Sequence, residues 1–161
     1  MALPPTVLPS RHHPRGAGRP VVYARAVARP LSMAFTAVMV VALAAVLQGT
    51  EVLGVMIWAV PLVYVAVSAW AVHQLHRRPA ALVLDGSHGA LPSVWEVAGE
   101  QPVRLRSVYS PRWEGEQLNV PIGRTVYALR SEDWADFGAV ERATRAAADA
   151  AHRMRASIAL N

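Results

Sequence analysis

Two stretches of the chain lack charged side chains and are apolar enough to cross a membrane. No charged side chain occurs in residues 31–50, and after Glu51 the next charged side chain is that of Arg77. Each stretch supplies the ~20 apolar residues that a helix needs to cross a hydrocarbon core of about 30 Å. In lipid, a helix satisfies its own backbone hydrogen bonds. We therefore predict two transmembrane helices, over about 31–48 and 52–73, joined by a short polar turn.

After this hairpin the hydrophobic pattern changes to the two-residue period of strands. Val103 and Leu105 alternate with Arg104 and Arg106, which places the two arginines on one face of a half-buried strand. Pro121 lacks a backbone donor and predicts an edge position or a bulge. We expect about five short antiparallel strands. They cover residues 81–84, 93–97, 103–106, 118–122 and 124–129, with a turn over 110–116.

The last part of the chain has the pattern of a long helix over about 132–159. Ser131 is a good N-cap residue, and apolar or small residues recur at steps of three and four. Such a seam packs either on the sheet of its own domain or on a partner helix. The seam comprises Phe137, Val140, Thr144, Ala147, Ala151, Met154 and Ile158. Of these, our candidate partner-binding residues are Phe137, Val140, Ala147, Ala151, Met154 and Ile158.

The first thirty residues contain six prolines and five arginines but no acidic residue. This spacing of prolines disfavours both helix and sheet. We predict that residues 1–30 form a disordered or extended cytoplasmic tail, which is either solvated or docked on a partner. The predicted organisation is therefore this tail, a helical hairpin over 31–76, and a small α+β domain over 77–161.

The composition agrees with a membrane protein. The 161 residues are 53% hydrophobic and 17% charged, against about 25% charged in ordinary soluble domains. The absence of cysteine excludes disulfides, thiolate metal sites and a cysteine nucleophile. Residues 1–30 carry a net charge of +5, residues 31–76 carry −1 and residues 77–161 carry +1. A nearly neutral globular part does not favour nucleic acid as a partner.

The arginines flank the predicted hairpin and are absent from its turn. Because positive residues near the ends of spans stay in the cytoplasm, both termini are expected there, in a multi-pass protein of the cytoplasmic (inner) membrane. Trp70 is predicted to lie at the same boundary, because aromatic residues are common at membrane interfaces. The predicted membrane-interface residues are Arg25, Arg29, Trp70, Arg77 and Arg78. Anionic lipid headgroups are the expected contacts of the arginines.

Few residues of the chain are candidates for a catalytic, metal-binding or cofactor-binding site. His73 and His76 lie three apart, so they share a helix face and could ligate a metal or haem, but no further ligand completes a site. A cluster at residues 85–88 combines Asp, Ser and His, but adjacent turn residues do not form a catalytic triad. No phosphate loop and no charged residue in the middle of a span is present. We expect no enzyme activity, no cofactor and no bound metal.

Two spans, a basic junction, short strands and a final long helix together resemble small bacterial membrane proteins that have a pleckstrin-homology-like (PH-like) domain after a helical hairpin. The residues behind the resemblance are Trp95-Glu96-Val97, the strand 124–129 and the step Ser131-Glu132-Asp133-Trp134 into the helix. Such domains have seven strands before their helix, whereas the pattern here accounts for about five. The resemblance implies a cytosolic scaffold for membrane proteins or lipids, without catalytic residues.

The sequence therefore predicts a non-catalytic accessory or scaffolding subunit of a bacterial membrane complex. Its partners would be other integral membrane subunits, and it could also form a homo-oligomer. One alternative is a stand-alone, lipid-associated regulatory membrane protein. Another is an electron carrier that binds haem or a metal through His73 and His76.

Overall fold

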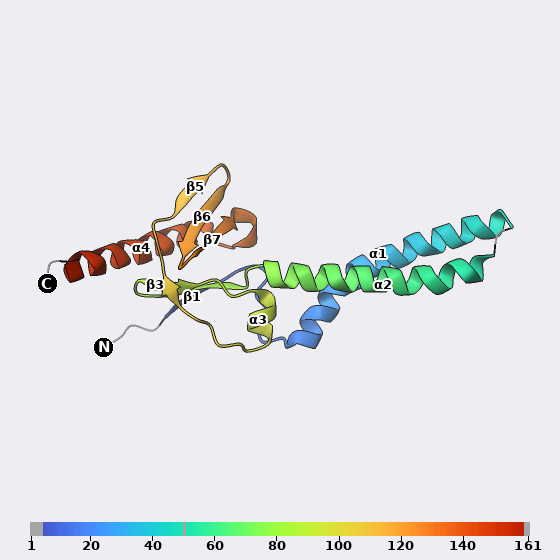
Figure 1. Ribbon diagram of the computed structural model, residues 1–161, viewed down its shortest axis with the longest axis horizontal. Coiled ribbons are helices and arrows are strands. Elements are labelled where there is room, and N and C mark those ends of the chain that lie inside the picture. The colour runs from blue at the N-terminus through green and yellow to red at the C-terminus, as the bar shows by residue number, and fades with distance from the viewer. Residues whose placement is uncertain (1–4, 50, 160–161) are drawn as a thin grey trace. The chain divides into compact units, whose positions relative to one another are not determined.

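The computed structural model describes residues 5–49 and 51–159, apart from the side chains of Val55, Ile158 and Ala159. The chain divides into two compact units. A helical unit covers residues 16–77, and a sheet unit combines the segment up to Arg15 with the chain from Arg78 onward (Figure 1). The sheet unit is thus made of two separate chain segments, and the helical unit lies between these segments in the sequence.

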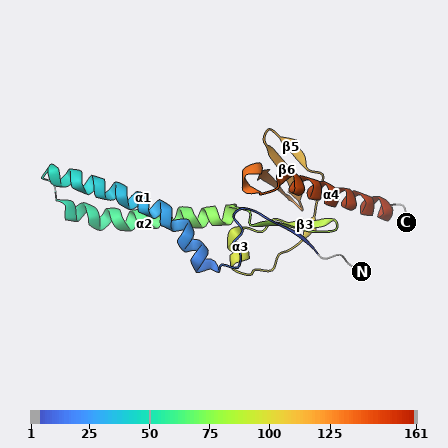
Figure 2. The ribbon, with the colours of Figure 1, turned by 180° about the vertical axis from the view of Figure 1, so that it is seen from behind.

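The helical unit is an antiparallel pair, α1 (Arg19–Leu47) and α2 (Val52–Arg77), which lie side by side in both views (Figures 1 and 2). The Tyr23 hydroxyl of α1 donates a hydrogen bond of 2.9 Å to the Ser68 hydroxyl of α2. Both helices are long and apolar enough to span a membrane, with mean hydropathies of 2.3 and 2.2. Within these apolar windows only 6% and 0% of residues are buried, so the apolar side chains face outward. An apolar exterior is typical of helices that contact lipid, whereas a soluble core helix is buried.

The first helix begins at Arg19, twelve residues before the predicted start. Our prediction that prolines prevent a helix in this region was wrong for residues 19–30. Pro20 is tolerated because the first turn of a helix has no intrahelical partner for its N–H groups. Pro30 lies inside the helix, and Figure 1 shows α1 changing direction after its N-terminal turns, as helices do at a proline. Burial of Val22 and Val27 favours this extension.

The sheet unit contains two antiparallel sheets and a C-terminal helix. The first sheet has the order β1-β2-β3-β4 and the second has the order β5-β6-β7. The strands are β1 (Thr6–Pro9), β2 (Ala81–Asp85), β3 (His88–Ala90), β4 (Arg106–Ser107), β5 (Arg112–Glu114), β6 (Gln117–Ile122) and β7 (Thr125–Arg130). The helices are α3 (Val94–Ala98), the 3-10 turn η1 (Ser131–Asp133) and α4 (Phe137–Ala159).

The first strand comes from the segment that we expected to be a tail. Residues 6–9 pair with residues 81–84 of β2, with Thr6 opposite Leu84 and Pro9 opposite Ala81. This corrects the boundary of the predicted domain, which also needs residues before the hairpin. Residues 1–4 of the predicted tail lie outside the described part of the chain. The helical hairpin is therefore an insertion between two neighbouring strands of one sheet.

Hydrogen bonds hold the segment that follows β1. The buried Ser10 hydroxyl donates to the Pro79 carbonyl at 2.6 Å, and the Ser10 amide donates to the Ala80 carbonyl at 2.8 Å. The Arg11 amide donates to the backbone carbonyl of Asp133 at 2.8 Å. The His12 Nε2 atom lies 3.0 Å from Asp133 Oδ1. These contacts attach the chain before α1 both to the start of β2 and to η1.

Three predictions for the middle of the chain were wrong. Residues 94–98 form helix α3 instead of a strand, because Ser93 and Glu96 make a capping box. The Ser93 amide donates to Glu96 Oε2 at 2.7 Å, and the Glu96 amide donates to the Ser93 hydroxyl at 3.3 Å. Of the predicted strand 103–106, only Arg106 is part of a strand, and residues 112–114 form β5 in the region predicted as a turn.

Pro121 lies in β6, which is the central strand of its sheet and not an edge. A proline fits there because β5 pairs only with residues 117–119 of β6, so it does not need the missing N–H group of Pro121. The Pro121 carbonyl accepts a hydrogen bond of 2.9 Å from the Tyr109 amide.

The final helix begins at Phe137, five residues after the predicted start. Ser131 opens the turn η1, and Asp136 precedes α4, where its Oδ1 accepts a hydrogen bond of 2.9 Å from the Ala139 amide. An aspartate at this position satisfies an otherwise unpaired helix N–H group. One face of α4 joins the sheets in a single core. The buried members are Leu82, Leu84, Val108, Leu118, Val120, Ile122, Leu129, Trp134, Val140, Ala147 and Ala148.

Candidate functional site: an arginine-lined pocket

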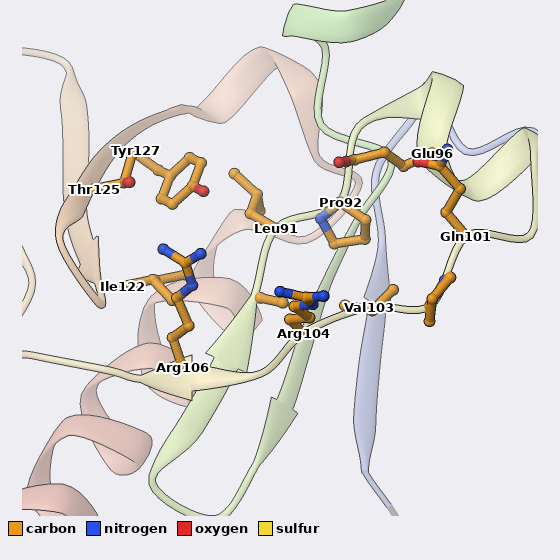
Figure 3. A pocket seen from close by; sticks show the side chains of 12 residues that line it. Leu91, Pro92, Glu96, Gln101, Val103, Arg104, Arg106, Ile122, Thr125 and Tyr127 are labelled. Carbon is orange, nitrogen blue, oxygen red and sulfur yellow. The ribbon is translucent and has the colours of Figure 1, made fainter.

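The sheet unit contains a polar pocket of about 440 Å³ (Figure 3). Its walls come from the end of β3, from α3 and the loop that follows it, from the start of β4 and from the β6–β7 hairpin. The lining residues are Ala90, Leu91, Pro92, Glu96, Gln101, Pro102, Val103, Arg104, Arg106, Ile122, Thr125 and Tyr127. Cavities of 300–1,000 Å³ are the usual size for small-ligand sites.

Two guanidinium groups dominate the charge of this pocket. Arg104 and Arg106 are exposed, and Figure 3 shows both side chains extending into the space together with the Tyr127 ring. Within residues 5–49 and 51–159, neither arginine has an ion pair. Glu96 is the one carboxylate of the lining, and its Oε2 atom already accepts from the Ser93 amide and hydroxyl at 2.7 and 2.9 Å. The pocket therefore offers positive charge with no committed counterion.

A glycine in the β6–β7 turn makes room for one of these arginines. Gly123 has φ of +64°, a left-handed conformation that favours glycine. A Cβ atom at this position would lie 2.7 Å from Arg106 Cδ and 3.2 Å from Arg106 Cβ. The amide of Gly123 also donates to the Ser107 carbonyl at 2.9 Å, next to Arg106. The turn thus lies against the aliphatic part of Arg106, and a side chain at position 123 would displace it.

The pocket wall is tied to the chain that leaves the helical hairpin. The Ala80 amide donates to the Pro92 carbonyl at 2.9 Å, and the Val94 amide donates to the Arg78 carbonyl at 3.0 Å. Ala80 is only three residues beyond the end of α2 at Arg77. Pro92 is thus hydrogen-bonded to a residue that follows, by three positions in the chain, a helix apolar enough to span a membrane.

The structure places most of the candidate partner-binding residues inside the sheet unit. Val140, Ala147 and Ala151 are buried, and Phe137 is half-buried against the core, so these four side chains are not free to bind a partner helix. Met154 is 53% exposed and remains accessible. The side chain of Ile158 lies outside the described part. The seam is thus mainly the contact of α4 with its own domain.

The predicted membrane-interface residues occur in the N-terminal half of α1 and toward the C-terminal end of α2. Trp70 is 48% exposed on α2, and Arg25 and Arg29 are exposed on α1. Arg77 and Arg78 are exposed at the end of α2. Exposed arginines that flank an apolar helix are favourable at the level of anionic headgroups.

The other candidates for chemistry are not assembled into a site. His76 Nδ1 lies 2.8 Å from the Val72 carbonyl one turn earlier in α2. Among the described residues, no group of three or more His, Asp or Glu side chains is placed to hold a metal ion. In the turn at residues 85–88, the Ser87 hydroxyl lies 3.1 Å from His88 Nδ1. The His73/His76 hypothesis gains no further ligand from the fold.

No family model, no curated protein and no solved structure matches this chain. We did not predict this pocket from the sequence. The alternation placed Arg104 and Arg106 on one face of a strand over residues 103–106, but only Arg106 lies in a strand, and Val103 lines the same pocket as the two arginines. The opposite wall, with Thr125 and Tyr127, comes from a hairpin about twenty residues later in the chain. No local pattern reveals that these two segments meet.

Proposed function

We propose that this chain is a non-catalytic accessory or scaffolding subunit of a bacterial membrane complex. In this proposal the helical hairpin anchors it in the cytoplasmic membrane, and the sheet unit is a PH-like interaction domain in the cytoplasm. The observation that carries the proposal is the insertion of the hairpin between β1 and β2, which are neighbours in one sheet.

The insertion supports a defined topology. Since β1 and β2 pair with each other, both must lie on the same side of any membrane, and the chain between them must cross it an even number of times. Helices α1 and α2 are long and apolar enough to supply two crossings. The arginines on both flanks of the hairpin favour the cytoplasmic side. The domain is thereby attached to the membrane through two adjacent chain segments, which restricts its motion more than a single linker would.

The strand arrangement supports the PH-like character of the domain. In the part of the chain that the structure describes, seven strands in antiparallel sheets of four and three precede the long helix α4. Seven strands before a helix is the number that the resemblance requires. On this proposal, the first strand precedes the hairpin, and the hairpin replaces the connection between the first two strands.

The make-up of the pocket favours binding over catalysis. Arginine stays protonated in proteins, so Arg104 and Arg106 cannot act as a general base. One carboxylate oxygen of Glu96, Oε2, is engaged in the capping box of α3. The lining is rich in hydrogen-bond donors, which favours the binding of an anionic ligand.

Single cysteines test the topology, because the natural chain contains none. Gln48→Cys lies in the α1–α2 turn and Glu116→Cys lies in the β5–β6 turn, and both positions are exposed. In intact spheroplasts, we expect a membrane-impermeant maleimide to label Cys at position 48 but to label position 116 only after lysis. Equal labelling of both positions before lysis would show that the hairpin does not span the membrane as proposed.

Native electrophoresis tests the accessory role. The tagged chain is extracted in mild detergent from its own host, and untagged host cells processed in parallel provide the control. We expect it to migrate in a larger assembly, with stoichiometric integral membrane proteins identified by mass spectrometry. Migration as a monomer or small homo-oligomer without partners would refute the accessory role.

The arginine-lined pocket favours one second candidate, a stand-alone lipid-associated regulatory protein. Its wall residue Pro92 is hydrogen-bonded to Ala80, three residues after α2, and the same pocket is lined by two arginines that have no ion pair among the described residues. A protein that migrates alone but retains anionic lipid would support this candidate.

A further inference from the structure

We propose that the pocket around Arg104 and Arg106 binds a ligand through a phosphate group. This inference rests on the proposed binding role of the sheet unit, but not on its membership of a larger complex. The ligand class follows from the donors, the shape and the position of the pocket.

The donors match a phosphate group. Each guanidinium presents parallel N–H groups that can contact two phosphate oxygens at once, and such charge-assisted pairs are about twice as strong as neutral hydrogen bonds. The hydroxyl groups of Thr125 and Tyr127 are on the same lining. Within residues 5–49 and 51–159, the Tyr127 hydroxyl has no hydrogen-bond partner, although its ring packs against the core. A ring packed in this way limits the positions that its hydroxyl can take in the lining.

The backbone of the β6–β7 turn prepares the site for one of its donors. With glycine at position 123, the stem of Arg106 passes over the turn at a distance that no Cβ atom would permit. An arginine that is already oriented loses less conformational entropy when it binds. Gly123 is therefore a positioning residue for Arg106, and it acts without contacting the ligand.

The pocket is larger than a phosphate ion and has an apolar side. Leu91, Pro92 and Ile122 form part of its wall, so there is room for the glycerol or other organic group that bears the phosphate. The connection of Pro92 to Ala80 favours a phosphomonoester lipid headgroup over a soluble phosphate ester as the source. Both sources share the same recognition chemistry, and titration separates them.

The test is calorimetric titration of the full chain in neutral detergent. One arm uses dihexanoyl phosphatidic acid, a second uses glycerol 3-phosphate, and dihexanoyl phosphatidylcholine is the zwitterionic control. We expect saturable binding of phosphatidic acid and no binding of phosphatidylcholine. Equal affinity for glycerol 3-phosphate would support the phosphate site but assign a soluble ligand to it. No binding of either phosphomonoester would overturn the proposal.

Variants connect the signal to the pocket. Removing a charged hydrogen-bonding partner costs about tenfold or more in affinity, so Arg104→Gln with Arg106→Gln should weaken binding by at least about a hundredfold. Arg112→Gln with Arg142→Gln is the matched control, because it removes the same charge from exposed positions of the same unit that do not line the pocket. An equal loss in both double variants would show non-specific attraction and overturn the site.

A third variant tests the positioning role. Gly123→Ala leaves both arginines in the sequence, but the added Cβ atom displaces the Arg106 stem. We expect weaker binding, and further removal of Arg106 in the Gly123→Ala background should then have less effect than in the natural chain. Unchanged affinity in Gly123→Ala would refute the role of the turn. Circular dichroism and thermal melting of each variant establish that the loss is not due to unfolding. Because purified protein is used, the result does not depend on whether partners are found in the native extract.

Discussion

Substitution of Ser10 by alanine tests whether β1 is a stable part of the domain. Ser10 is 6% exposed, and its hydroxyl donates to the Pro79 carbonyl at 2.6 Å and accepts from the His12 amide at 3.1 Å. The substitution removes both bonds without removing the Ser10 amide bond to the Ala80 carbonyl.

The magnitude follows from the groups that are left behind. A typical intramolecular hydrogen bond contributes about 1 kcal/mol, and leaving a buried carbonyl without a partner costs about 1–3 kcal/mol. Ser10→Ala should therefore reduce the free energy of local opening of residues 5–13 by about 2 kcal/mol. That change raises the opening equilibrium constant by about 30-fold.

Hydrogen exchange followed by mass spectrometry measures this opening, because amides that are protected by β1 pairing exchange through local unfolding. We expect peptides covering residues 5–13 to exchange about 30-fold faster in Ser10→Ala, while peptides from β6 and β7 are unchanged. Ser157→Ala is the matched control, since that hydroxyl donates to the Met154 carbonyl at 2.7 Å on an exposed part of α4.

Two results would refute the reasoning. If the natural chain exchanges at the unprotected rate over residues 5–13, β1 is not stably paired with β2. If Ser10→Ala exchanges at the natural rate, the Ser10 hydroxyl does not hold the segment, and the pairing depends on the backbone bonds alone.

Three further predictions concern packing in the sheet unit, and each is checked by thermal or denaturant unfolding of the detergent-solubilised chain. Leu118→Ala should cost about 2–5 kcal/mol, because this leucine is fully buried; a cost below 1 kcal/mol would contradict its place in the core. Gly89→Ala should destabilise the unit, since a Cβ atom there would lie 2.7–2.9 Å from side chains of both neighbouring strand segments, whereas Gly138→Ala in α4 should stabilise it by up to about 1 kcal/mol. Val140→Glu buries an unpaired charge and should prevent folding of the unit, while Met154→Glu should be tolerated on the exposed part of the seam; equal tolerance would place the whole seam outside the core.

Some features follow from the sequence because their physical cause is local. The absence of charge over two long stretches predicts two membrane-competent helices, and both are present. Alternation of apolar residues identifies β6 and β7 within one or two residues of their bounds. The three- and four-residue steps identify the seam of α4, although its first turn begins later than predicted.

Local signals also competed with one another. The Ser93-x-x-Glu96 pattern is a helix-start signal, but the apolar residues between 94 and 97 resemble a buried strand, and the strand interpretation was wrong. For the first thirty residues, we predicted neither helix nor sheet because of the prolines, although the segment also contains apolar residues. Two of these prolines, Pro20 and Pro30, nevertheless occur within α1.

What the sequence by itself determined is therefore the hairpin, the later strands and the amphipathic character of the final helix, since each depends on residues within a few turns of one another. Only the tertiary structure decided that residues 6–9 complete the first sheet and that Arg104 and Arg106 face Thr125 and Tyr127 across a pocket. Ser10 and Pro79 are 69 residues apart, and their hydrogen bond leaves no periodicity in the sequence. Such contacts form because burial of the shared core outweighs the entropy of closing a long loop, and that entropy rises only slowly with loop length.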